Sequence, residues 1–427
     1  MATAAWQGVD LRGLAARVGT PFYLYDAHLL RARIAAIRDL TDAPGLQARY
    51  AMKACSVAQV LRTMREQGIW IDAVSGNEVL RARAAGYPMG ANIPEVMLST
   101  DVFRDNALKV ISQHKVLPNL GSPAMVRQLA DAGYRGPIAL RLNPGFGHGH
   151  VQGCDTGGPS SKHGLWPDAA LAAAENAARQ GMTVTLLHAH VGSGPTTEEF
   201  QASMQQLVDF FADCLPAYPH AQAVSLGGGL PHPYKPEAAA IDLEPFGHLL
   251  RECQARFSQQ TGTNIRVEIE PGRYFVAPVA TLVTRVTDIK RTHTNAKGPG
   301  HTFVMVDAGF CDLVRPAMYG SFHRINVWEA PDDAPLEPVV LSGPLCESGD
   351  VFTRDDAELL QPRPLPPVRA GDLVLIHDAG AYGNTMSSNY NSIGRAPQVW
   401  LDDDAPYLIS RRETFEDLVR TECFTPL

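Results

Sequence analysis

Four side chains that could act together on a carbonyl compound stand at the ends of apolar segments far apart in the sequence. Lys53 closes the segment Tyr50-Ala51-Met52-Lys53, and His190, Glu270 and Arg273 follow other apolar runs much later in the chain. A lysine at the end of a buried strand loses hydration, which lowers the pKa of its amine, and a neutral amine forms Schiff bases with carbonyl compounds. Taken alone, the Lys53 segment is explained more simply by an edge strand whose lysine extends its amine into water.

Three distant segments end in groups suited to binding and polarising a ligand. One is the glycine turn Gly227-Gly228-Gly229, one contains His190 and Ser193, and one contains Glu270 and Arg273. Alone, each has an ordinary explanation as a tight turn, a core histidine or a surface ion pair. Together they place an anion-binding turn, an imidazole, a carboxylate and a guanidinium at the carboxyl ends of predicted strands. Such ends converge on one face of a parallel barrel, where these folds carry their active sites.

Composition and charge exclude several classes of function. The chain has 427 residues, with 45 acidic and 37 basic side chains and a formal net charge of −8. Because it contains no basic run, nucleic acid and anionic membranes are poor partners. No apolar stretch is long enough to span a bilayer, and the N-terminus lacks a basic region followed by an apolar one. We therefore expect a cytoplasmic protein.

Cysteine and histidine usage gives no metal site. The seven cysteines form no CxxC pair, and an odd, dispersed set predicts reduced thiols and no structural zinc. The segment Gly145-Phe146-Gly147-His148-Gly149-His150 is rich in histidine. Alternate histidines in a glycine loop without acidic neighbours predict a flexible lid and no metal ligands. The cysteines are at positions 55, 154, 214, 253, 311, 346 and 423.

Apolar segments alternate with helical patterns between residues 27 and 275. Eight candidate strands separated by helices favour an α/β domain, a closed (β/α)8 barrel of the TIM type, over an open sheet. The helix expected at 167–180 has Pro167 in its first turn and Gly181 after its end. Residues 143–164 form a long loop, which in a compact barrel indicates a functional flap. The candidate strands are 48–53, 70–74, 96–98, 115–119, 138–142, 184–190, 222–226 and 265–269.

After Arg273 the pattern changes to strands joined by loops, two of them rich in proline. Short apolar strands with such connectors predict a second, mainly antiparallel β domain. The run Phe22-Tyr23-Leu24-Tyr25 is expected to add a strand to it. The sequence thus predicts a barrel over 27–275 and a β domain of the barrel or sandwich type built from 1–26 and 276–427. The candidate β-domain strands are 276–289, 302–306, 339–342 and 373–377.

Six motifs, in this order, resemble those of the pyridoxal-phosphate-dependent decarboxylases of the alanine racemase-like fold, over nearly the whole chain. Two segments, Cys346-Glu347-Ser348-Gly349-Asp350 and Met386-Ser387-Ser388-Asn389-Tyr390-Asn391, point to the diaminopimelate decarboxylase branch over the ornithine decarboxylase branch. The motifs are Tyr50-Ala51-Met52-Lys53-Ala54, His190-Val191-Gly192-Ser193, Gly227-Gly228-Gly229, Glu270-Pro271-Gly272-Arg273, Gly343-Pro344-Leu345-Cys346-Glu347-Ser348-Gly349-Asp350 and Gly380-Ala381-Tyr382-Gly383.

The resemblance implies that the chain binds pyridoxal 5'-phosphate. Lys53 would carry the cofactor as a Schiff base, Glu270 would keep the pyridine nitrogen protonated, and His190 would stack on the ring. Backbone amides at a turn suit the phosphate. The other cofactor positions are Gly227, Gly228, Gly229, Ser193, Tyr382 and Arg273 at the phosphate, and Asp72 and Arg141 along the cofactor.

The same resemblance implies decarboxylation of meso-2,6-diaminopimelate to L-lysine. Arg315 and Tyr319 would hold the distal carboxylate, a role suited to the planar guanidinium. Arg273 and Tyr382 would also contact the substrate, and Glu347 would accept the distal ammonium group.

Cys346 is the expected proton donor to the carbanion, although a free cysteine is often only core filler. In the family, the segment with Cys346 and Glu347 reaches the active site of the partner subunit. The resemblance therefore implies a two-fold homodimer with two composite sites. A monomer with an open site is the alternative.

Two positions depart from the family pattern. Cys55 stands where many relatives carry asparagine, and His163 stands where phenylalanine is common. These changes leave the chemistry intact and bear on the substrate contacts of the flap.

Two other functions stay open. One is a decarboxylase of the same fold that acts on a D-configured basic amino acid or a carrier-bound glutamyl group. Arg315 argues against it, because a substrate without the distal carboxylate leaves a buried guanidinium unpaired. The other is a non-enzymatic pyridoxal-phosphate-binding protein, and the β domain with Cys346 and Glu347 argues against that.

Overall fold

The computed structural model describes residues 6, 8–147, 156–194, 196–403 and 405–425. The chain divides into two compact units. We call Arg31–His232 with Ala239–Phe275 the barrel unit, and Met1–Leu30, Pro233–Ala238 and Val276–Leu427 the β unit. The short segment Pro233–Ala238 thus belongs to the β unit although both its flanks belong to the barrel unit.

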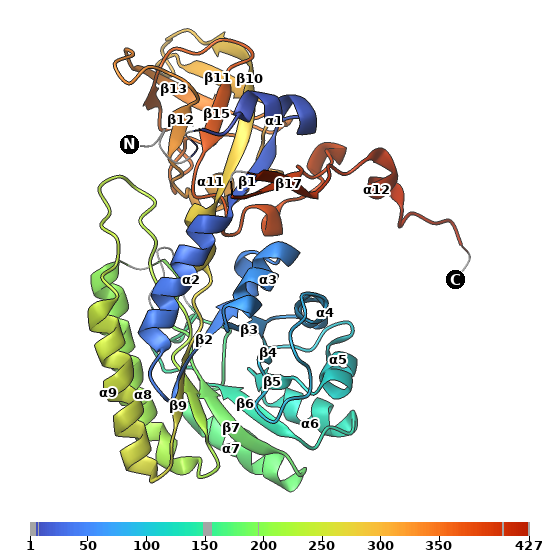
Figure 1. Cartoon of the computed structure of the whole chain (residues 1–427), viewed down its shortest axis with the longest axis vertical. Coiled ribbons are helices and arrows are strands. Elements are labelled where there is room, and N and C mark those ends of the chain that lie inside the picture. The colour runs from blue at the N-terminus through green and yellow to red at the C-terminus, as the bar shows by residue number, and fades with distance from the viewer. Residues whose placement is uncertain (1–5, 7, 148–155, 195, 404, 426–427) are drawn as a thin grey trace. The chain divides into compact units, whose positions relative to one another are not determined.

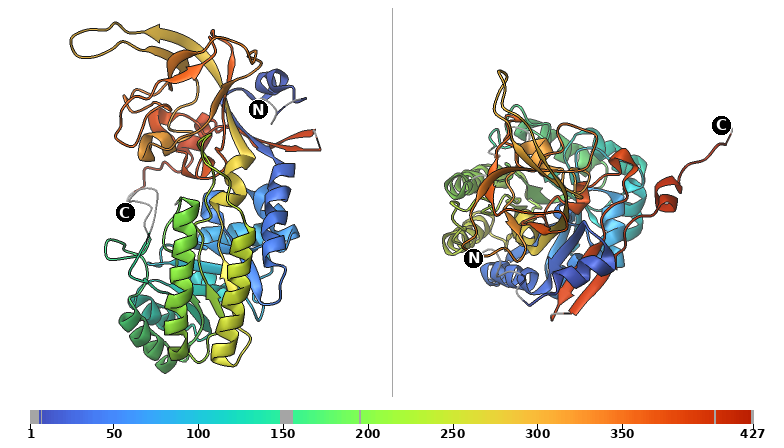
Figure 2. Two further views of the ribbon diagram at one scale, coloured as in Figure 1. Left: turned by 90° about the vertical axis from the view of Figure 1, so that its left-hand side faces the viewer. Right: turned by 90° about the horizontal axis from the view of Figure 1, so that it is seen from above.

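The barrel unit is a closed barrel of eight strands in which each strand pairs in parallel with the next (Figure 1). Helices alternate with these strands along the chain, and the left view of Figure 2 shows two of them, green and yellow, on the outside of the unit, which confirms the expected (β/α)8 fold. The strands are β2 (Leu46–Ala51), β3 (Trp70–Ala73), β4 (Val96–Thr100), β5 (Leu117–Leu120), β6 (Pro137–Arg141), β7 (Thr183–His188), β8 (Ala223–Ser225) and β9 (Arg266–Ile269). The helices are α2 (Ala27–Thr41), α3 (Ala58–Glu66), α4 (Gly76–Ala84), α5 (Ala107–His114), α6 (Ala124–Asp131), α7 (Pro167–Arg179), α8 (Thr197–Cys214) and α9 (Glu244–Thr261).

Local signals in the sequence explain where these helices begin and end. α7 starts with Pro167, whose missing amide hydrogen costs nothing at a first helical position. α8 opens with a capping box, in which Thr196 Oγ1 accepts from the Glu199 amide and the Glu199 carboxylate accepts from the Thr196 amide. In α4, the Ser75 hydroxyl alone caps the first turn, because it accepts from the Glu78 amide.

The inside of the barrel is filled by side chains, as in other closed eight-stranded barrels. Consecutive strands β4 to β8 each contribute one residue to an apolar cluster. The barrel closes where β9 pairs with β2, with Ala48 opposite Ile269. The cluster consists of Met97, Leu117, Ala139, Leu186 and Ala223.

The β unit contains a nine-stranded sheet with the order β14-β13-β11-β10-β1-β16-β17, while β15 pairs with β10 and β12. Most pairs are antiparallel, but β1 and β16 run parallel, as do β11 and β13. The strands are β1 (Phe22–Asp26), β10 (Ala280–Arg291), β11 (Thr302–Val306), β12 (Ile325–Val327), β13 (Glu337–Ser342), β14 (Arg363–Leu365), β15 (Leu373–Ile376), β16 (Gln398–Asp402) and β17 (Ala405–Ser410). Short helices of this unit are α1 (Leu11–Val18), α11 (Arg315–Tyr319) and α12 (Phe415–Val419), while α10 (Arg273–Val276) spans the boundary between the two units in the sequence.

The expected second domain is thus confirmed as mainly antiparallel, with local differences. The strand expected at 276–289 begins only at Ala280, because residues 273–279 form the helical turns α10 and η5 (Ala277–Val279). Four strands of this unit, β12, β14, β16 and β17, were not expected from the sequence. Two of them, β12 and β14, have only three residues each, and β14 contains Pro364.

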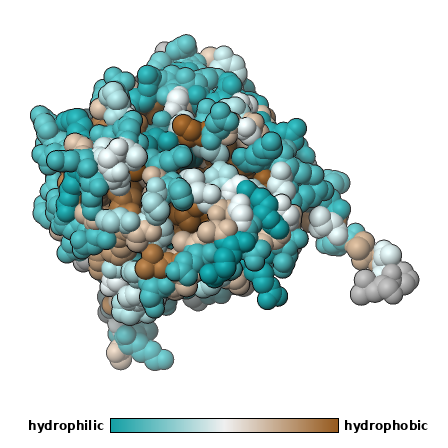
Figure 3. Space-filling model, turned by 90° about the horizontal axis from the view of Figure 1, so that it is seen from below, coloured by the Kyte–Doolittle hydropathy of each residue, from teal (hydrophilic) through white to brown (hydrophobic). Residues whose placement is uncertain are grey.

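The surface facing the viewer in Figure 3 is largely hydrophilic, and its apolar residues form small separate patches. Within the described ranges, no helix has the length and apolar character needed to cross a membrane.

Candidate active site

Side chains from most of the barrel strands meet at one cavity of about 250 Å³. They stand at the carboxyl ends of their strands, which is the face that carries active sites in this fold. The structure therefore brings together five of the residues predicted from sequence, and adds others that were not predicted. The predicted residues are Lys53, Asp72, Arg141, His190 and Glu270, and the others include Ser99, Asp101, Lys162, His163 and His188.

Lys53 differs in position from the prediction. It does not belong to strand β2, which ends at Ala51, but to the 3-10 turn η2 (Met52–Ala54) that follows. The amide of Cys55 bonds to the Met52 carbonyl at 3.1 Å and closes this turn. The Lys53 side chain is exposed at the cavity, so the expectation of a buried lysine was wrong.

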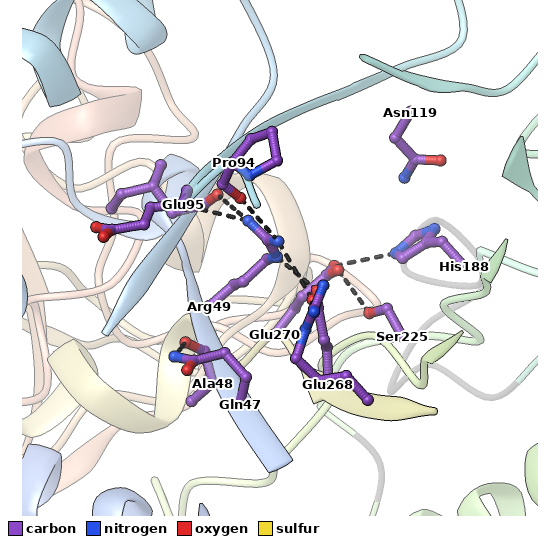
Figure 4. A network of polar contacts seen from close by, with 12 residues as sticks. Gln47, Ala48, Arg49, Pro94, Glu95, Asn119, His188, Ser225, Glu268 and Glu270 are labelled. Carbon is purple, nitrogen blue, oxygen red and sulfur yellow. Dashed lines mark hydrogen bonds and ion pairs between the residues drawn. The ribbon is translucent and has the colours of Figure 1, made fainter. Parts of the chain in front are cut away.

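Glu270 follows β9 and is held by two neighbouring strands (Figure 4). Its Oε2 lies 3.0 Å from His188 Nε2 at the end of β7, and its Oε1 accepts from Ser225 Oγ of β8 at 2.6 Å. Burial alone would raise the pKa of Glu270. The charge and hydrogen bond of His188, with the Ser225 hydroxyl, outweigh burial and lower that pKa below its ordinary value. Glu270 is therefore kept as a carboxylate.

Asp72 is a second buried carboxyl group lining the same cavity, and its environment acts in the opposite direction. Burial, followed by the negative charge of Glu270, raises the pKa of Asp72, and the Ser99 hydrogen bond and the Lys53 charge only partly oppose this. Asp72 thus favours its protonated form, whereas Glu270 favours its ionised form. Such a divergence is typical of sites that carry acid–base chemistry.

A buried ion pair between neighbouring strands adds positive charge near Glu270. Arg49 on β2 and Glu268 on β9 are fully buried, with Arg49 Nε 2.5 Å from Glu268 Oε2. Arg49 also donates through Nη2 to Glu268 Oε1 and to the carbonyls of Ile71, Pro94 and Glu95, two of which are marked in Figure 4, so its donors are satisfied. The charge of Arg49 adds to those that lower the pKa of Glu270.

His190 faces the glycine turn through its Nδ1, which accepts from the Gly228 amide at 3.2 Å. Burial, with the charges of Lys53 and Arg141, lowers the pKa of His190 well below its ordinary value, so the imidazole is neutral. A side chain at Gly228 would place its Cβ 2.4 Å from the Glu270 carbonyl oxygen. Glycine is therefore required for this close approach of the turn.

The three glycine amides are not equally available to an anion. The Gly227 amide donates to Ser225 Oγ at 3.2 Å, and the Gly228 amide is used by His190. The Gly229 amide makes no hydrogen bond to any residue that the structure describes. Nearby in the barrel unit, Arg273 Nη2 donates to Ser193 Oγ at 3.1 Å.

The C-terminal arm of the 143–164 loop also reaches the cavity through His163. His163 Nδ1 lies 2.5 Å from Asp101 Oδ2, and Asp101 Oδ1 accepts from the Gly164 amide. The Asn143 side chain bonds to the backbone of Gly145, Gly158 and His163, and so ties the two arms of the loop together. His148 and His150 of the expected lid lie outside the described residues.

Within the β unit, Arg315 and Tyr319 begin and end the short helix α11, and positions four apart lie on the same face of a helix. Arg315 is 3% exposed. Its Nη1 lies 3.0 Å from His323 Nε2, and its guanidinium carbon lies 4.6 Å from the centre of the Tyr234 ring.

Cys346 and Glu347 lie on an exposed turn of the β unit. The buried carboxylate of Asp350 builds this turn, because its Oδ2 accepts from the Leu345 amide at 2.8 Å and its Oδ1 from the Phe310 amide at 2.7 Å. Tyr382, also in the β unit, has a φ of 59°, a conformation that non-glycine residues adopt at a cost and that clusters at functional sites.

The residues that position the predicted site residues through hydrogen bonds were not expected from the sequence. His188, Ser225 and Asp101 stand at or just after the ends of β7, β8 and β4. A search for polar residues at the carboxyl ends of all eight strands would have found them. His323 carried no comparable signal, because its backbone partner, the His377 carbonyl, comes 54 residues later. Asp350 belongs to the motif 343–350, but its hydrogen bond to the Phe310 amide is not visible in the sequence.

Comparison with known proteins gives consistent matches. Residues 28–277 match the family "Pyridoxal-dependent decarboxylase, pyridoxal binding domain". The chain is 40% identical over 421 residues to the diaminopimelate decarboxylase of Escherichia coli K12, covering 97% of this chain and 96% of that protein.

Solved structures give the same picture. A crystal structure of diaminopimelate decarboxylase matches with a TM-score of 0.89 and 38% identity over 97% of both chains. The diaminopimelate decarboxylase of Helicobacter pylori complexed with L-lysine matches with a TM-score of 0.84 and 26% identity, covering 96% of this chain and 98% of that one. Its bound ligand is a small diamino acid.

Proposed function

Because the chain belongs to the pyridoxal-dependent decarboxylase family, we propose that it is a carboxy-lyase that converts meso-2,6-diaminopimelate to L-lysine, the last step of lysine biosynthesis. The observation that carries this proposal is the cavity at which Lys53, neutral His190 and ionised Glu270 meet. An amine, an aromatic ring and a carboxylate are the groups that a pyridoxal cofactor requires.

The residues at the cavity fit pyridoxal 5'-phosphate. Lys53 offers an exposed amine for the aldehyde of the cofactor. Glu270, held ionised by His188 and Ser225, can pair with a protonated pyridine nitrogen, and the ring of His190 can cover one face. When bound, the cofactor supplies an electron sink for the electron pair that remains after CO₂ departs. Asp72 and Arg141 line the same cavity and complete its polar wall.

For the phosphate, the structure favours a subset of the predicted groups. Gly229 offers an amide without another partner among the described residues, while the amides of Gly227 and Gly228 already bond within the barrel unit. Ser193 and Arg273 supply a hydroxyl and a guanidinium next to each other. We also assign Tyr382 to the phosphate, as the resemblance implies. We propose that Gly227 and Gly228 shape the turn and that Gly229 contacts the anion.

Substrate recognition requires groups for a second amino acid head. Arg315 and Tyr319 share one face of α11 and suit a distal carboxylate, since a guanidinium binds a carboxylate through two parallel hydrogen bonds. Arg273 and Tyr382 are our candidates for the substrate near the reacting carbon. Glu347, exposed on its turn, would accept the distal ammonium.

We further propose that the enzyme is a homodimer with composite sites. Cys346 and Glu347 are exposed on a turn that the buried Asp350 makes rigid, which suits residues that act in a partner subunit. In this arrangement Cys346 would return a proton to the substrate carbon. The free thiols of the described cysteines are consistent with the cytoplasm, where we place the protein.

Measurement of CO₂ release tests the function. The purified protein, loaded with pyridoxal 5'-phosphate, is offered meso-diaminopimelate, D-lysine, L-lysine and L-ornithine. We expect release from meso-diaminopimelate at a kcat/KM at least about a hundredfold above the others. Equal or faster release from D-lysine would favour the alternative of a D-configured basic amino acid. Cofactor binding without release from any compound would favour a non-enzymatic protein.

Mixing two inactive variants tests the dimer. Lys53→Ala removes the amine from one site, and Cys346→Ala removes the thiol that the same subunit contributes to the other site. Random exchange then gives one intact site in each mixed dimer, so we expect recovery of about a quarter of the wild-type activity. No recovery after verified subunit exchange would contradict composite sites.

A further inference from the structure

The guanidinium of Arg315 is fixed by two neutral groups of the β unit. His323 Nε2 lies 3.0 Å from Arg315 Nη1, and the Tyr234 ring lies under the guanidinium with 4.6 Å between its centre and the guanidinium carbon. Tyr234 also packs edge-on against His323, with 5.6 Å between the ring centres. Arg315, His323 and Tyr234 therefore form one cluster. Tyr234 comes from the segment Pro233–Ala238, which joins the β unit from the middle of the barrel sequence.

The hydrogen bonds of His323 admit one arrangement of protons. His323 Nδ1 lies 2.9 Å from the His377 carbonyl oxygen, which can only accept, so Nδ1 carries the hydrogen. Arg315 can only donate, so Nε2 must accept. His323 is thus a neutral imidazole whose two nitrogens have different partners.

The surroundings of His323 keep it neutral. It is 1% exposed, and burial, followed by the positive charge of Arg315, lowers the pKa of His323 to about 3. The charge of Arg363 acts in the same direction, while the His377 carbonyl and Asp378 oppose it. The acceptor at Nε2 is therefore present at every pH at which the enzyme would work.

These contacts determine how a carboxylate can approach Arg315. Tyr234 covers one face of the guanidinium plane, and a carboxylate binds to an arginine in that plane through two N–H groups. His323 takes one Nη1 hydrogen and so fixes the rotation of the fork. An arginine side chain is long and flexible, so ordering it on binding costs conformational entropy. A guanidinium that is already held in place loses less of this entropy when it binds its ligand.

We propose that His323 is a positioning residue that holds the Arg315 guanidinium in the orientation required for the second carboxylate of the substrate, and so sets selectivity for a dicarboxylic diamino acid. This inference rests on the proposed function, in which Arg315 binds that carboxylate.

Two amide variants of His323 separate its two hydrogen bonds. In His323→Gln the side-chain amide reaches the position of Nε2, and its oxygen can still accept from Arg315. In His323→Asn the amide reaches only the position of Nδ1, where its NH₂ can still donate to the His377 carbonyl. His323→Gln therefore keeps the hydrogen bond that orients Arg315, whereas His323→Asn keeps only the hydrogen bond to the His377 carbonyl.

A matched pair of ligands reports on the clamp. L-Lysine, the expected product, retains the distal carboxylate, and 1,5-diaminopentane is the same molecule without it. Calorimetric titration of the cofactor-loaded protein with each compound gives the ratio of the two affinities. We expect His323→Asn to reduce this ratio about tenfold or more, mainly by weakening L-lysine, and His323→Gln to keep it within about threefold of wild type. The KM for diaminopimelate should follow the L-lysine affinity, with a smaller change in kcat.

The outcomes are distinguishable. A ratio retained in His323→Asn and lost in His323→Gln would overturn the proposal, because a backbone anchor and not the Arg315 contact would then matter. Equal loss in both would overturn it as well. If His323→Asn does not fold, retention of the ratio in His323→Gln supports the proposal and its loss contradicts it.

Arg315→Ala separates this inference from the proposed function. If Arg315→Ala leaves the wild-type ratio unchanged, the clamp itself is wrong and the proposed recognition fails with it. If Arg315→Ala lowers the ratio and His323→Asn does not, only the positioning role of His323 is wrong. A wild-type protein that does not decarboxylate diaminopimelate contradicts the proposed function independently of these ratios.

Discussion

The Nε2 atom of His188 lies 3.0 Å from Oε2 of Glu270, and both side chains are buried, His188 at the end of β7 and Glu270 just after β9, with β8 between these two strands. Ser225 holds the other carboxylate oxygen at 2.6 Å. This relationship gives a physical reason for the charge of Glu270, because a buried carboxylate without such partners would take up a proton. Glu270, which is expected to face the pyridine nitrogen, is therefore already ionised before any ligand binds.

Replacement of His188 tests this preparation. His188→Phe removes the charge-assisted hydrogen bond, worth roughly 1.5–3 kcal/mol, so kcat for diaminopimelate should fall roughly 10- to 100-fold. His188→Gln keeps a donor near the position of Nε2 and should lose less. His220→Phe, at an exposed position of the same unit, is the control. Equal losses in the Phe and Gln variants, each with an unchanged absorption spectrum of the bound cofactor, would indicate a purely structural role.

Asp72 should make stability depend on pH. Burial and Glu270 raise the pKa of Asp72 from 3.8 to about 8, so between these values the folded protein keeps a proton that the unfolded chain has lost. The free energy of unfolding must then fall as pH rises through this window, and level off above about pH 8. Asp72→Asn removes this titration. We expect the thermal midpoint of cofactor-free Asp72→Asn, relative to that of the cofactor-free wild type, to increase as pH rises.

Glu270→Gln provides the opposite control for Asp72. The pKa of Glu270 is lowered, so its charge stabilises the folded state above the ordinary carboxyl value and this contribution is lost as pH falls. As pH rises from acid values, the thermal midpoint of Glu270→Gln should therefore fall further below that of the wild type. A difference between wild type and Asp72→Asn that stays constant with pH would contradict the account of the carboxyl pair.

Arg49 and Glu268 test how the barrel interior carries charge. Arg49→Met leaves a buried carboxylate with Arg266 as its remaining cation, and should lower the free energy of unfolding by roughly 3 kcal/mol or more. The double variant Arg49→Met/Glu268→Leu removes the orphaned charge and should recover part of this loss. Urea unfolding followed by circular dichroism measures all four proteins of the cycle. Additive losses would show that the two side chains are not coupled.

Arg315 should determine which diamino acids are used. Leaving out one partner of a bidentate charged pair costs roughly 1.5–3 kcal/mol or more, so Arg315→Ala should lower kcat/KM for diaminopimelate by about a hundredfold. The already low rate with D-lysine should change little, because D-lysine has no distal carboxylate. Glu347→Gln should also weaken the use of diaminopimelate through loss of the ammonium acceptor. Equal effects of Arg315→Ala on both compounds would contradict the clamp.

Much of the fold could be predicted because each element carried its own local signal. α7 has proline at its start and glycine beyond its end, and all eight barrel strands were found from short apolar runs between helical patterns. The convergence of Lys53, His190 and Glu270 followed from the rule that active sites stand at the carboxyl ends of barrel strands. It required no knowledge of side-chain packing.

The remaining features depend on contacts between distant segments. The end of the strand before Lys53 could not be located from the sequence, because Met52, the first residue after β2, is as apolar as Ala51, its last residue. The bond between His188 and Glu270 joins residues from β7 and from the end of β9, so no local pattern reveals it. The same holds for His323, whose role depends on Arg315 and on a carbonyl that comes much later in the sequence.

Lys53 is the residue that we assign as the amine that binds the cofactor. Two lysines, Lys53 and Lys162, line the cavity, so an experiment can test directly which of them binds the cofactor. The protein is incubated with pyridoxal 5'-phosphate and reduced with borohydride, and the labelled peptide is identified by mass spectrometry. We predict the label on Lys53 in wild type and in Lys162→Ala, and its absence in Lys53→Ala. A label on Lys162 in the wild-type protein, or one that persists in Lys53→Ala, would contradict the account.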